Sequence, residues 1–267
     1  MITEHNTPLL RVEKLTKRFG GLTAVDALDF VLYPGEILGM IGPNGAGKST
    51  TFNLIAGALQ ADDGQVYLAD KPVLGLAPHL LAARGIMRTF QHNQPFPSMA
   101  LLDNVLVGAH RRRLGSLWAL LLGGARSRRH EAGLRKRAGE LIEFVGLSDC
   151  LATDVANLPF GQGRLLEVAR ALAGEPSVIL LDEPAAGLTP QECERLAKVI
   201  REISRRGIAV LLIEHDMRFL LPLAQRVVVL NFGRKIADES PAAISSDAAV
   251  IDAYLGKPTM ARADAYA

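Results

Sequence analysis

Residues 37–59 read ILGMIGPNGAGKSTTFNLIAGAL, and this stretch decides the fold. The apolar run from Glu36 to Ile41 predicts a buried strand. The next segment, GPNGAGKS at 42–49, matches the pattern G-x-x-x-x-G-K-[ST], and helix-forming residues follow it. Because strand, glycine-rich loop and helix stand in the order that a phosphate-binding loop requires, we favour that interpretation over an ordinary glycine-rich turn.

Each part of this loop suits a bound triphosphate. Glycines let the backbone curl so that its N–H groups point at phosphate oxygens, and the helix that follows adds its positive N-terminal dipole. Lys48 would neutralise the β and γ phosphates, and the Ser49 hydroxyl would coordinate Mg²⁺. The nucleotide-binding residues predicted in this loop are Gly42, Pro43, Asn44, Gly45, Ala46, Gly47, Lys48, Ser49 and Thr50.

A second motif, VILLDEP at 178–184, supplies two carboxylates. The apolar strand ends in Asp182 and Glu183, at the carboxyl edge where open α/β sheets bind ligands. We expect Asp182 to hold the Mg²⁺ shell through water and Glu183 to polarise the attacking water as general base. A strand end with solvated acids is the alternative, and the phosphate loop upstream makes it the weaker one.

Length and composition limit the architecture. With 267 residues, 49% of them hydrophobic, the chain can bury a full core, but a second complete ATPase unit would not fit. The net charge of +2 gives no reason to expect a nucleic-acid partner. The charge is unevenly spread, however, because the segment from Arg111 to Arg137 contains nine Lys or Arg residues and a single acid, Glu131. The most apolar run, 114–125, is shorter than the roughly 18 residues of a membrane span, so we expect a cytoplasmic protein.

The rest of the chain alternates strand and helix patterns. Short strands and turns fill 9–40, and a charged helical pattern from Asp103 to about Val155 reads as an inserted lobe. Alternating units then resume and predict a mostly parallel α/β sheet with helices on both faces. Their predicted order is a helix at 165–174, a strand at 178–182, a helix at 191–206, a strand at 208–215 and a strand at 226–234.

Phosphate loops occur in several enzyme classes, and a third segment separates them. LPFGQGRLLEVARAL at 158–172 resembles the signature sequence of ABC transporter ATPases, and Gln162 stands twenty residues before Asp182, as that family spaces them. No NKxD motif for guanine recognition is present. The resemblance implies ATP and Mg²⁺ as ligands, and contacts from the signature segment to ATP bound by a second copy. That segment consists of Leu158, Pro159, Phe160, Gly161 and Gln162.

The same resemblance assigns further residues. Gln91 in RTFQH is similar to the glutamine that touches Mg²⁺ and reports the nucleotide state to the membrane domain. His215 in LLIEHDM is similar to the switch histidine, which with Lys48 and Glu183 completes the implied catalytic set. Phe19 stands where the family places an adenine-stacking aromatic, and Val25 would line the same face. Taken singly, a solvated amide, a strand-end histidine and a core phenylalanine remain alternatives.

The signature segment departs from the common LSGGQ at two positions. Pro159 replaces a serine whose hydroxyl and N–H usually reach the γ phosphate, and Phe160 replaces a glycine. Because proline offers neither donor, Gly161, the Gln162 side chain and the dipole of the following helix would carry more of that contact.

Over roughly residues 9–256 the chain looks like the larger ATPase subunit of branched-chain amino-acid importers. The resemblance implies an N-terminal antiparallel β subdomain, a separate permease, a second ATPase subunit as homo- or heterodimer, an indirect periplasmic binding protein, and peripheral attachment to the cytoplasmic face of the membrane. A urea or amide importer, a lipopolysaccharide-extracting exporter, a non-transport ABC ATPase and a regulatory module without turnover are the alternatives. The expected division is one domain over 1–257, with a core at 9–100 and 158–240, a helical subdomain at 101–157, a C-terminal extension at 241–257 and a flexible tail at 258–267.

Overall fold

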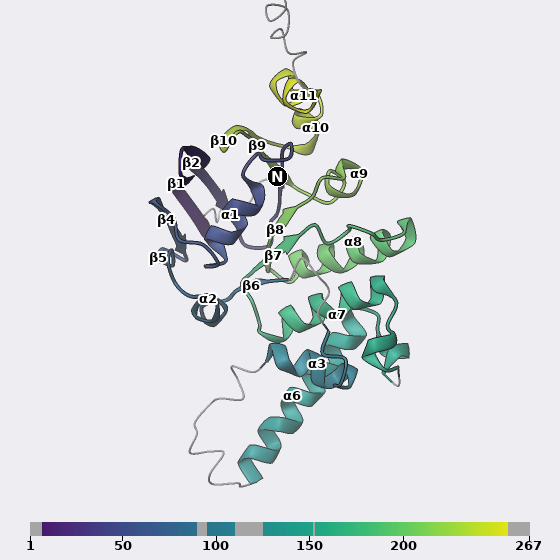
Figure 1. Ribbon diagram of the computed structural model, residues 1–267. Coiled ribbons are helices and arrows are strands. Elements are labelled where there is room, and N and C mark those ends of the chain that lie inside the picture. Colours follow the sequence, from purple (N-terminus) through teal and green to yellow (C-terminus); the bar gives the residue numbers. More distant parts are fainter. Residues whose placement is uncertain (1–6, 90–94, 110–124, 152, 256–267) are drawn as a thin grey trace, which may run out of the picture.

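The computed structural model describes residues 7–89, 95–109, 125–151 and 153–255 (Figure 1). Gln91, most of the apolar run 114–125 and the expected tail 258–267 lie outside these residues. The strands are β1 Leu10–Phe19, β2 Leu22–Leu32, β3 Ile37–Ile41, β4 Asp63–Leu68, β5 Lys71–Pro72, β6 Ile86–Arg88, β7 Val178–Asp182, β8 Ala209–Ile213, β9 Arg226–Asn231 and β10 Arg234–Glu239. The helices are α1 Lys48–Ile55, α2 Pro78–Arg84, α3 Leu101–Gly108, α6 Ala125–Phe144, α7 Phe160–Ala173, α8 Pro190–Arg205, α9 Met217–Leu220, α10 Pro241–Ile244 and α11 Ala248–Leu255, with 3-10 turns at Ser148–Cys150 and Val155–Asn157.

A six-stranded sheet in the order β10-β9-β3-β8-β7-β6 forms the centre of the molecule, and all its neighbouring strands run parallel except β10 and β9. Every residue of β3, β7 and β8 is buried, as expected for parallel strands covered on both faces. Alternate residues enter two separate cores, because successive side chains of a strand point to opposite faces. One core joins the sheet to α3, α6, α7 and α8, and the other joins it to α1 and the N-terminal strands.

The N-terminal strands form a second sheet in the order β2-β1-β4-β5, with antiparallel pairing throughout. Its inner residues, among them Leu10, Val12 and Leu28, share the second core with Phe52 of α1. In Figure 1 this sheet and α1 lie beside the upper part of the central sheet. The predicted α/β fold with an N-terminal antiparallel sheet is therefore confirmed.

The structure corrects one predicted strand. The strand predicted at 226–234 is too long, because β9 ends at Asn231 and β10 begins at Arg234, after a tight turn at Phe232 and Gly233. Both turn residues have positive φ, 45° at Phe232 and 80° at Gly233, which is the backbone of the commonest two-residue hairpin. The prediction was wrong because Phe232 is an unusual residue for this turn, where Asn or Gly is usual.

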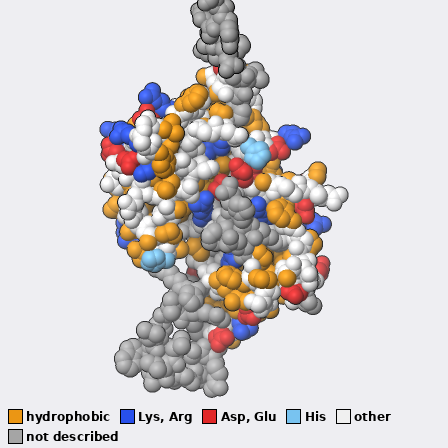
Figure 2. Space-filling view, viewed as in Figure 1, with side chains coloured by type: hydrophobic (Ala, Val, Ile, Leu, Met, Phe, Trp, Pro, Cys, Tyr) orange, Lys and Arg blue, Asp and Glu red, His pale blue; other side chains and the backbone are white. Residues whose placement is uncertain are grey.

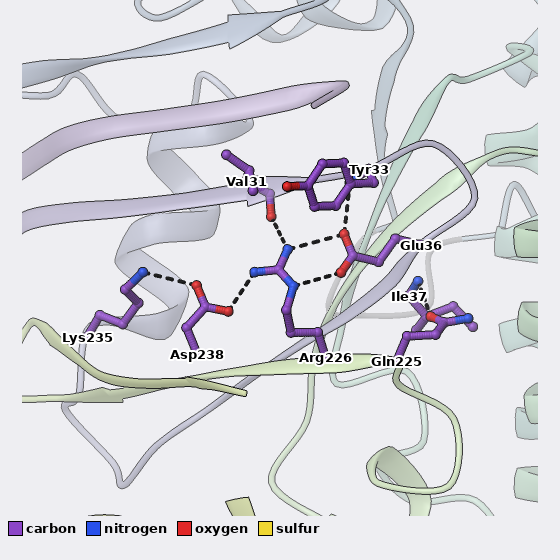
Figure 3. A network of polar contacts seen from close by, with 8 residues as sticks. All are labelled: Val31, Tyr33, Glu36, Ile37, Gln225, Arg226, Lys235 and Asp238. Carbon is purple, nitrogen blue, oxygen red and sulfur yellow. Dashed lines mark hydrogen bonds and ion pairs between the residues drawn. The ribbon is translucent and has the colours of Figure 1, made fainter. Parts of the chain in front are cut away.

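An ion-pair network ties the end of the sheet together (Figure 3). Arg226 at the start of β9 donates from Nε to Glu36 at 2.9 Å, and it also pairs with Asp238 of β10 at 2.5 Å. A third bond, 2.5 Å long, reaches the carbonyl oxygen of Val31 in β2. Because one guanidinium joins both sheets to the turn before β3, it fixes the strand that leads into the glycine-rich loop.

Helices α3, α6 and α7 pack together at the end of the molecule away from the antiparallel sheet (Figure 1). In Figure 2, apolar side chains gather in patches over this end, near α3. Among the helices that the structure describes, none combines the length and the apolar character needed to cross a bilayer.

Candidate nucleotide site

The glycine-rich loop leaves β3 and enters α1, which begins at Lys48. Gly42 and Gly47 have φ of 153° and 100°, and a Cβ on either would overlap a backbone carbonyl, that of Leu230 or that of Ala24. These two positions therefore require glycine. The loop is bound between the β9–β10 turn and β2, and this packing holds its backbone in a curled conformation.

The Lys48 side chain folds back over this loop. Its Nζ donates to the carbonyl oxygens of Gly42 at 2.6 Å and Pro43 at 3.0 Å, and the residue is buried. Burial lowers the pKa of Lys48, and the nearby charges of Glu183 and Asp182 oppose that shift. The ammonium is thus held at the base of the loop, beside the two carboxylates of the second motif.

A cavity of about 360 Å³ opens above the loop, and its lining joins residues far apart in the sequence. Phe19 and Thr23 border it on one side, and Glu183 reaches it from the end of β7. The remaining lining residues are Leu22, Ala24, Phe232 and the whole segment from Asn44 to Thr50. The cavity therefore brings together Lys48, Ser49 and Glu183, which the sequence placed in separate motifs.

Phe19 and Val25, both predicted to contact the adenine, lie in different surroundings. The Phe19 ring is half-exposed and borders the cavity, with the Lys17 ammonium 5.5 Å from its centroid. Val25 was expected on the same face, but its side chain is fully buried in the core below the antiparallel sheet and does not border the cavity. Its neighbours in β2, Thr23 and Ala24, border the cavity instead.

The carboxyl end of β7 positions the proposed catalytic pair. Glu183 has a left-handed backbone, with φ of 46°, and its N–H bonds to the carbonyl of Ile213 at 3.0 Å. Its Oε1 lies 3.8 Å from Nδ1 of His215, and the two side chains are 31% and 62% exposed. A non-glycine residue in this conformation costs about 1–3 kcal/mol, and such strain gathers at functional sites.

Sequence reasoning missed two polar residues near this edge. Arg88, at the end of β6, donates to Oδ2 of Asp182 at 2.9 Å, and Asp182 is the carboxylate expected to serve Mg²⁺. Glu214 is buried, and its Oε1 accepts a bond from the backbone N–H of Ala185 at 2.8 Å, which fixes the loop after Glu183. Burial raises the pKa of Glu214 above its ordinary value, against the lowering effect of that hydrogen bond.

The signature segment lies at the start of α7, with Pro159 as its N-cap. Phe160 is half-exposed, with the Arg164 guanidinium 5.1 Å from its ring. The Gln162 side chain accepts a hydrogen bond from Sγ of Cys150 at 3.3 Å. Within the described residues, Leu158 packs on the helical core and none of residues 158–162 borders the cavity above the glycine-rich loop.

The N-terminus of α8 adds a negative side chain beside this segment. Thr189 and Glu192 form a reciprocal capping box at the start of α8. Hydrogen bonds from Thr189, and a weaker one from the backbone of Gly161, hold the pKa of Glu192 below its usual range. A side chain at Gly161 would require the Glu192 carboxylate to move from this position.

The chain is similar to known proteins over most of its length. The family model described as "ABC transporter" matches residues 25–186, more than half of the chain. The chain belongs to the ABC transporter family. It is an ATP-binding cassette ATPase, and the resemblance on which the site residues were assigned is confirmed at the level of the family.

Relatives of this ATPase cover nearly all of it. The high-affinity branched-chain amino acid transport ATP-binding protein LivG of Escherichia coli K12 is 39% identical over 94% of this chain and 98% of its own length. BraF of Pseudomonas aeruginosa, which carries the same description, matches equally well. The crystal structure of MJ1267 in its ADP conformation, an ATP-binding cassette of an ABC transporter, has a TM-score of 0.82 at 33% identity, covering 94% of this chain and 100% of its own.

Proposed function

We propose that this ATPase binds ATP in the cavity above the glycine-rich loop and hydrolyses it with Glu183 as general base. The supporting observation is that Lys48, Ser49 and Glu183 border one cavity, with His215 beside Glu183. Lys48 and the loop N–H groups would bind the phosphates. The Glu183 carboxylate would accept a proton from the attacking water, and the His215 imidazole would orient that carboxylate.

The residues at this edge fit a magnesium ion. Ser49 borders the cavity at the start of α1. Oδ1 of Asp182 is buried and has no hydrogen-bond partner among the residues that the structure describes, as suits an oxygen that serves a ligand. Bound Mg²⁺ would neutralise phosphate charge during transfer to water. Gln91, the third proposed ligand, lies outside the described residues.

A second subunit would complete the site. The signature segment stands on another helix, α7, and does not reach this cavity in its own chain. The structure of MJ0796 in a post-hydrolysis state with ADP and Pi, 25% identical with a TM-score of 0.71, is described as dimeric. We propose that ATP is held between the loop of one subunit and the signature segment of another, and that the second subunit is either an identical copy or a related ATPase.

We propose that the membrane partner docks in a groove of this chain. Its volume is about 540 Å³, and β6, α2, α3 and α7 border it with mostly small or apolar side chains, among them Met87, Val107 and Ala171. The permease would insert a short helix there, which would place the ATPase on the cytoplasmic face of the membrane. Similarity to LivG and BraF over 98% of their length supports branched-chain amino acids as cargo. A periplasmic binding protein would deliver this cargo to the permease.

Reconstitution tests this proposal directly. The ATPase would be copurified with its permease, placed in vesicles with the matching binding protein, and assayed for ATP-dependent uptake of labelled leucine. Leucine uptake that stops with Glu183→Gln is expected. Uptake of urea without leucine, or lipid extraction without any uptake, would refute the assignment of cargo while leaving the ATPase assignment standing.

A further inference from the structure

Arg88 joins two parts of the nucleotide site that lie far apart in the sequence. One terminal nitrogen donates to Oδ2 of Asp182 at 2.9 Å, and the other donates to Oδ1 of Asn53 at 2.6 Å. Asn53 belongs to α1, one turn after Ser49, and Asp182 ends β7. The guanidinium therefore lies between the helix that follows the phosphate loop and the carboxylate proposed for the metal.

The two oxygens of Asp182 are in different situations. The side chain is 1% exposed, so water cannot compensate its charge, and Arg88 occupies Oδ2. Oδ1 is buried and has no hydrogen-bond partner in the described part of the chain. A buried polar atom without a partner is costly, and it points to a ligand that binds there. Arg88 thus fixes one oxygen of the carboxylate and leaves the other for that ligand.

Among the described residues that line the cavity or hydrogen-bond Asp182, positive and negative charges are equal in number. Lys48 and Arg88 bring two positive charges, and Asp182 and Glu183 bring two negative ones. Lys48 donates to carbonyl oxygens of its own loop, so in the described residues Arg88 is the cation that hydrogen-bonds Asp182. A guanidinium stays charged at all relevant pH values, and it repels a dication that approaches the same carboxylate.

We propose that Arg88 is the resident counter-ion of Asp182 and that it prevents the site from binding a divalent cation without nucleotide. This inference rests on the proposed magnesium site. A dication alone would raise the net charge of a balanced site, whereas a dication carried by a triphosphate arrives with excess negative charge. The site would therefore accept the metal together with the nucleotide, and Asp182 would keep its position between turnovers.

The proposal is tested by measuring how tightly the purified full-length chain binds Mn²⁺ without nucleotide. The electron paramagnetic resonance signal of free Mn²⁺, which is lost on binding, gives the bound fraction. Arg88→Gln removes the charge and keeps a polar amide side chain at this position. We expect this variant to bind Mn²⁺ about tenfold more tightly than wild type, or about 1.4 kcal/mol. Arg88→Lys, which keeps the charge, should behave as wild type. Arg84→Gln is the matched control, because Arg84 is an exposed arginine of the neighbouring α2.

Each result has a defined meaning. Equal Mn²⁺ affinity in Arg88→Gln and wild type would overturn the counter-ion role, because a purely structural arginine would not change metal binding. Tighter binding in Arg88→Lys as well would overturn the charge argument. A second measurement of Mn²⁺ binding, with a non-hydrolysable ATP analogue present, separates this inference from the proposed function. If Asp182→Asn leaves nucleotide-dependent Mn²⁺ binding unchanged, the assignment of Asp182 to the magnesium site fails, and the inference fails with it. Weaker binding in Asp182→Asn with no gain in Arg88→Gln would refute the role of Arg88 alone.

Discussion

Replacement of Phe232 by Asn should make the protein more stable and its nucleotide binding weaker. Phe232 occupies the first position of the β9–β10 turn with φ of 45°, and a left-handed backbone costs an ordinary residue about 1–2 kcal/mol. Asparagine tolerates this conformation and precedes glycine in the preferred turn. The ring is 84% exposed, so little buried apolar area is lost. We therefore expect a gain of about 1 kcal/mol in the free energy of unfolding, or about 2–4 °C in Tm.

The cost should appear in the nucleotide site. Phe232 borders the cavity together with Phe19, and Gly233 beside it donates from its backbone N–H to the carbonyl of Ala46 at 3.0 Å, so the turn is anchored to the phosphate loop. An aromatic contact contributes about 0.5–1.5 kcal/mol beyond buried area. Loss of the ring should raise the Kd for ADP by about twofold to tenfold, because tenfold corresponds to about 1.4 kcal/mol.

Urea unfolding and calorimetric titration with ADP measure the two effects on the same samples. Phe19→Ala is the control variant, because Phe19 borders the same cavity without a left-handed backbone, so it should lose affinity with no gain in stability. If Phe232→Asn were less stable than wild type, or bound ADP with unchanged affinity, the strain would not serve nucleotide binding and the reasoning would be refuted.

Three further changes test the site. Glu183→Gln should lower ATP turnover about 10²- to 10⁴-fold in a phosphate-release assay while nucleotide affinity is kept, and parent-level turnover would exclude Glu183 as the base. Gly47→Ala should lose nucleotide affinity and about 1–3 kcal/mol of stability, because its Cβ would overlap the Ala24 carbonyl. Gly139→Ala, whose added Cβ meets nothing within 4 Å, should keep both its affinity and its stability. Equal behaviour of the two variants in titration and urea unfolding would contradict this expectation. Because burial raises the pKa of Glu214, the folded protein holds this proton more tightly than the unfolded chain, and stability falls as pH rises from the unfolded to the folded pKa. Glu214→Gln should therefore gain stability relative to wild type across that window, which urea unfolding at a series of pH values measures. If the difference in free energy of unfolding between Glu214→Gln and wild type stayed constant over these pH values, the buried charge of Glu214 would not be the cause.

The sequence by itself determined the family, the α/β fold and the order of the motifs. Segments 42–49, 158–162 and 178–183 each carry local patterns, in which residue types at short spacing prescribe a loop, a helix start or a strand end. Such patterns can be recognised in the sequence because phosphate binding and strand formation depend on residues that are close together in the chain. The strand at 178–182 was predicted with its observed bounds for the same reason.

Only the tertiary structure decided what lies between these motifs. Arg88 meets Asp182 across 94 positions of sequence, because β6 and β7 are neighbours in the sheet, and no local pattern marks that pairing. Phe232 reaches the nucleotide cavity because its turn packs against the phosphate loop. Val25 does not border that cavity, because it is packed in the core below the antiparallel sheet. These placements depend on which strands pair and which face each residue takes, and both are set by the assembled sheets.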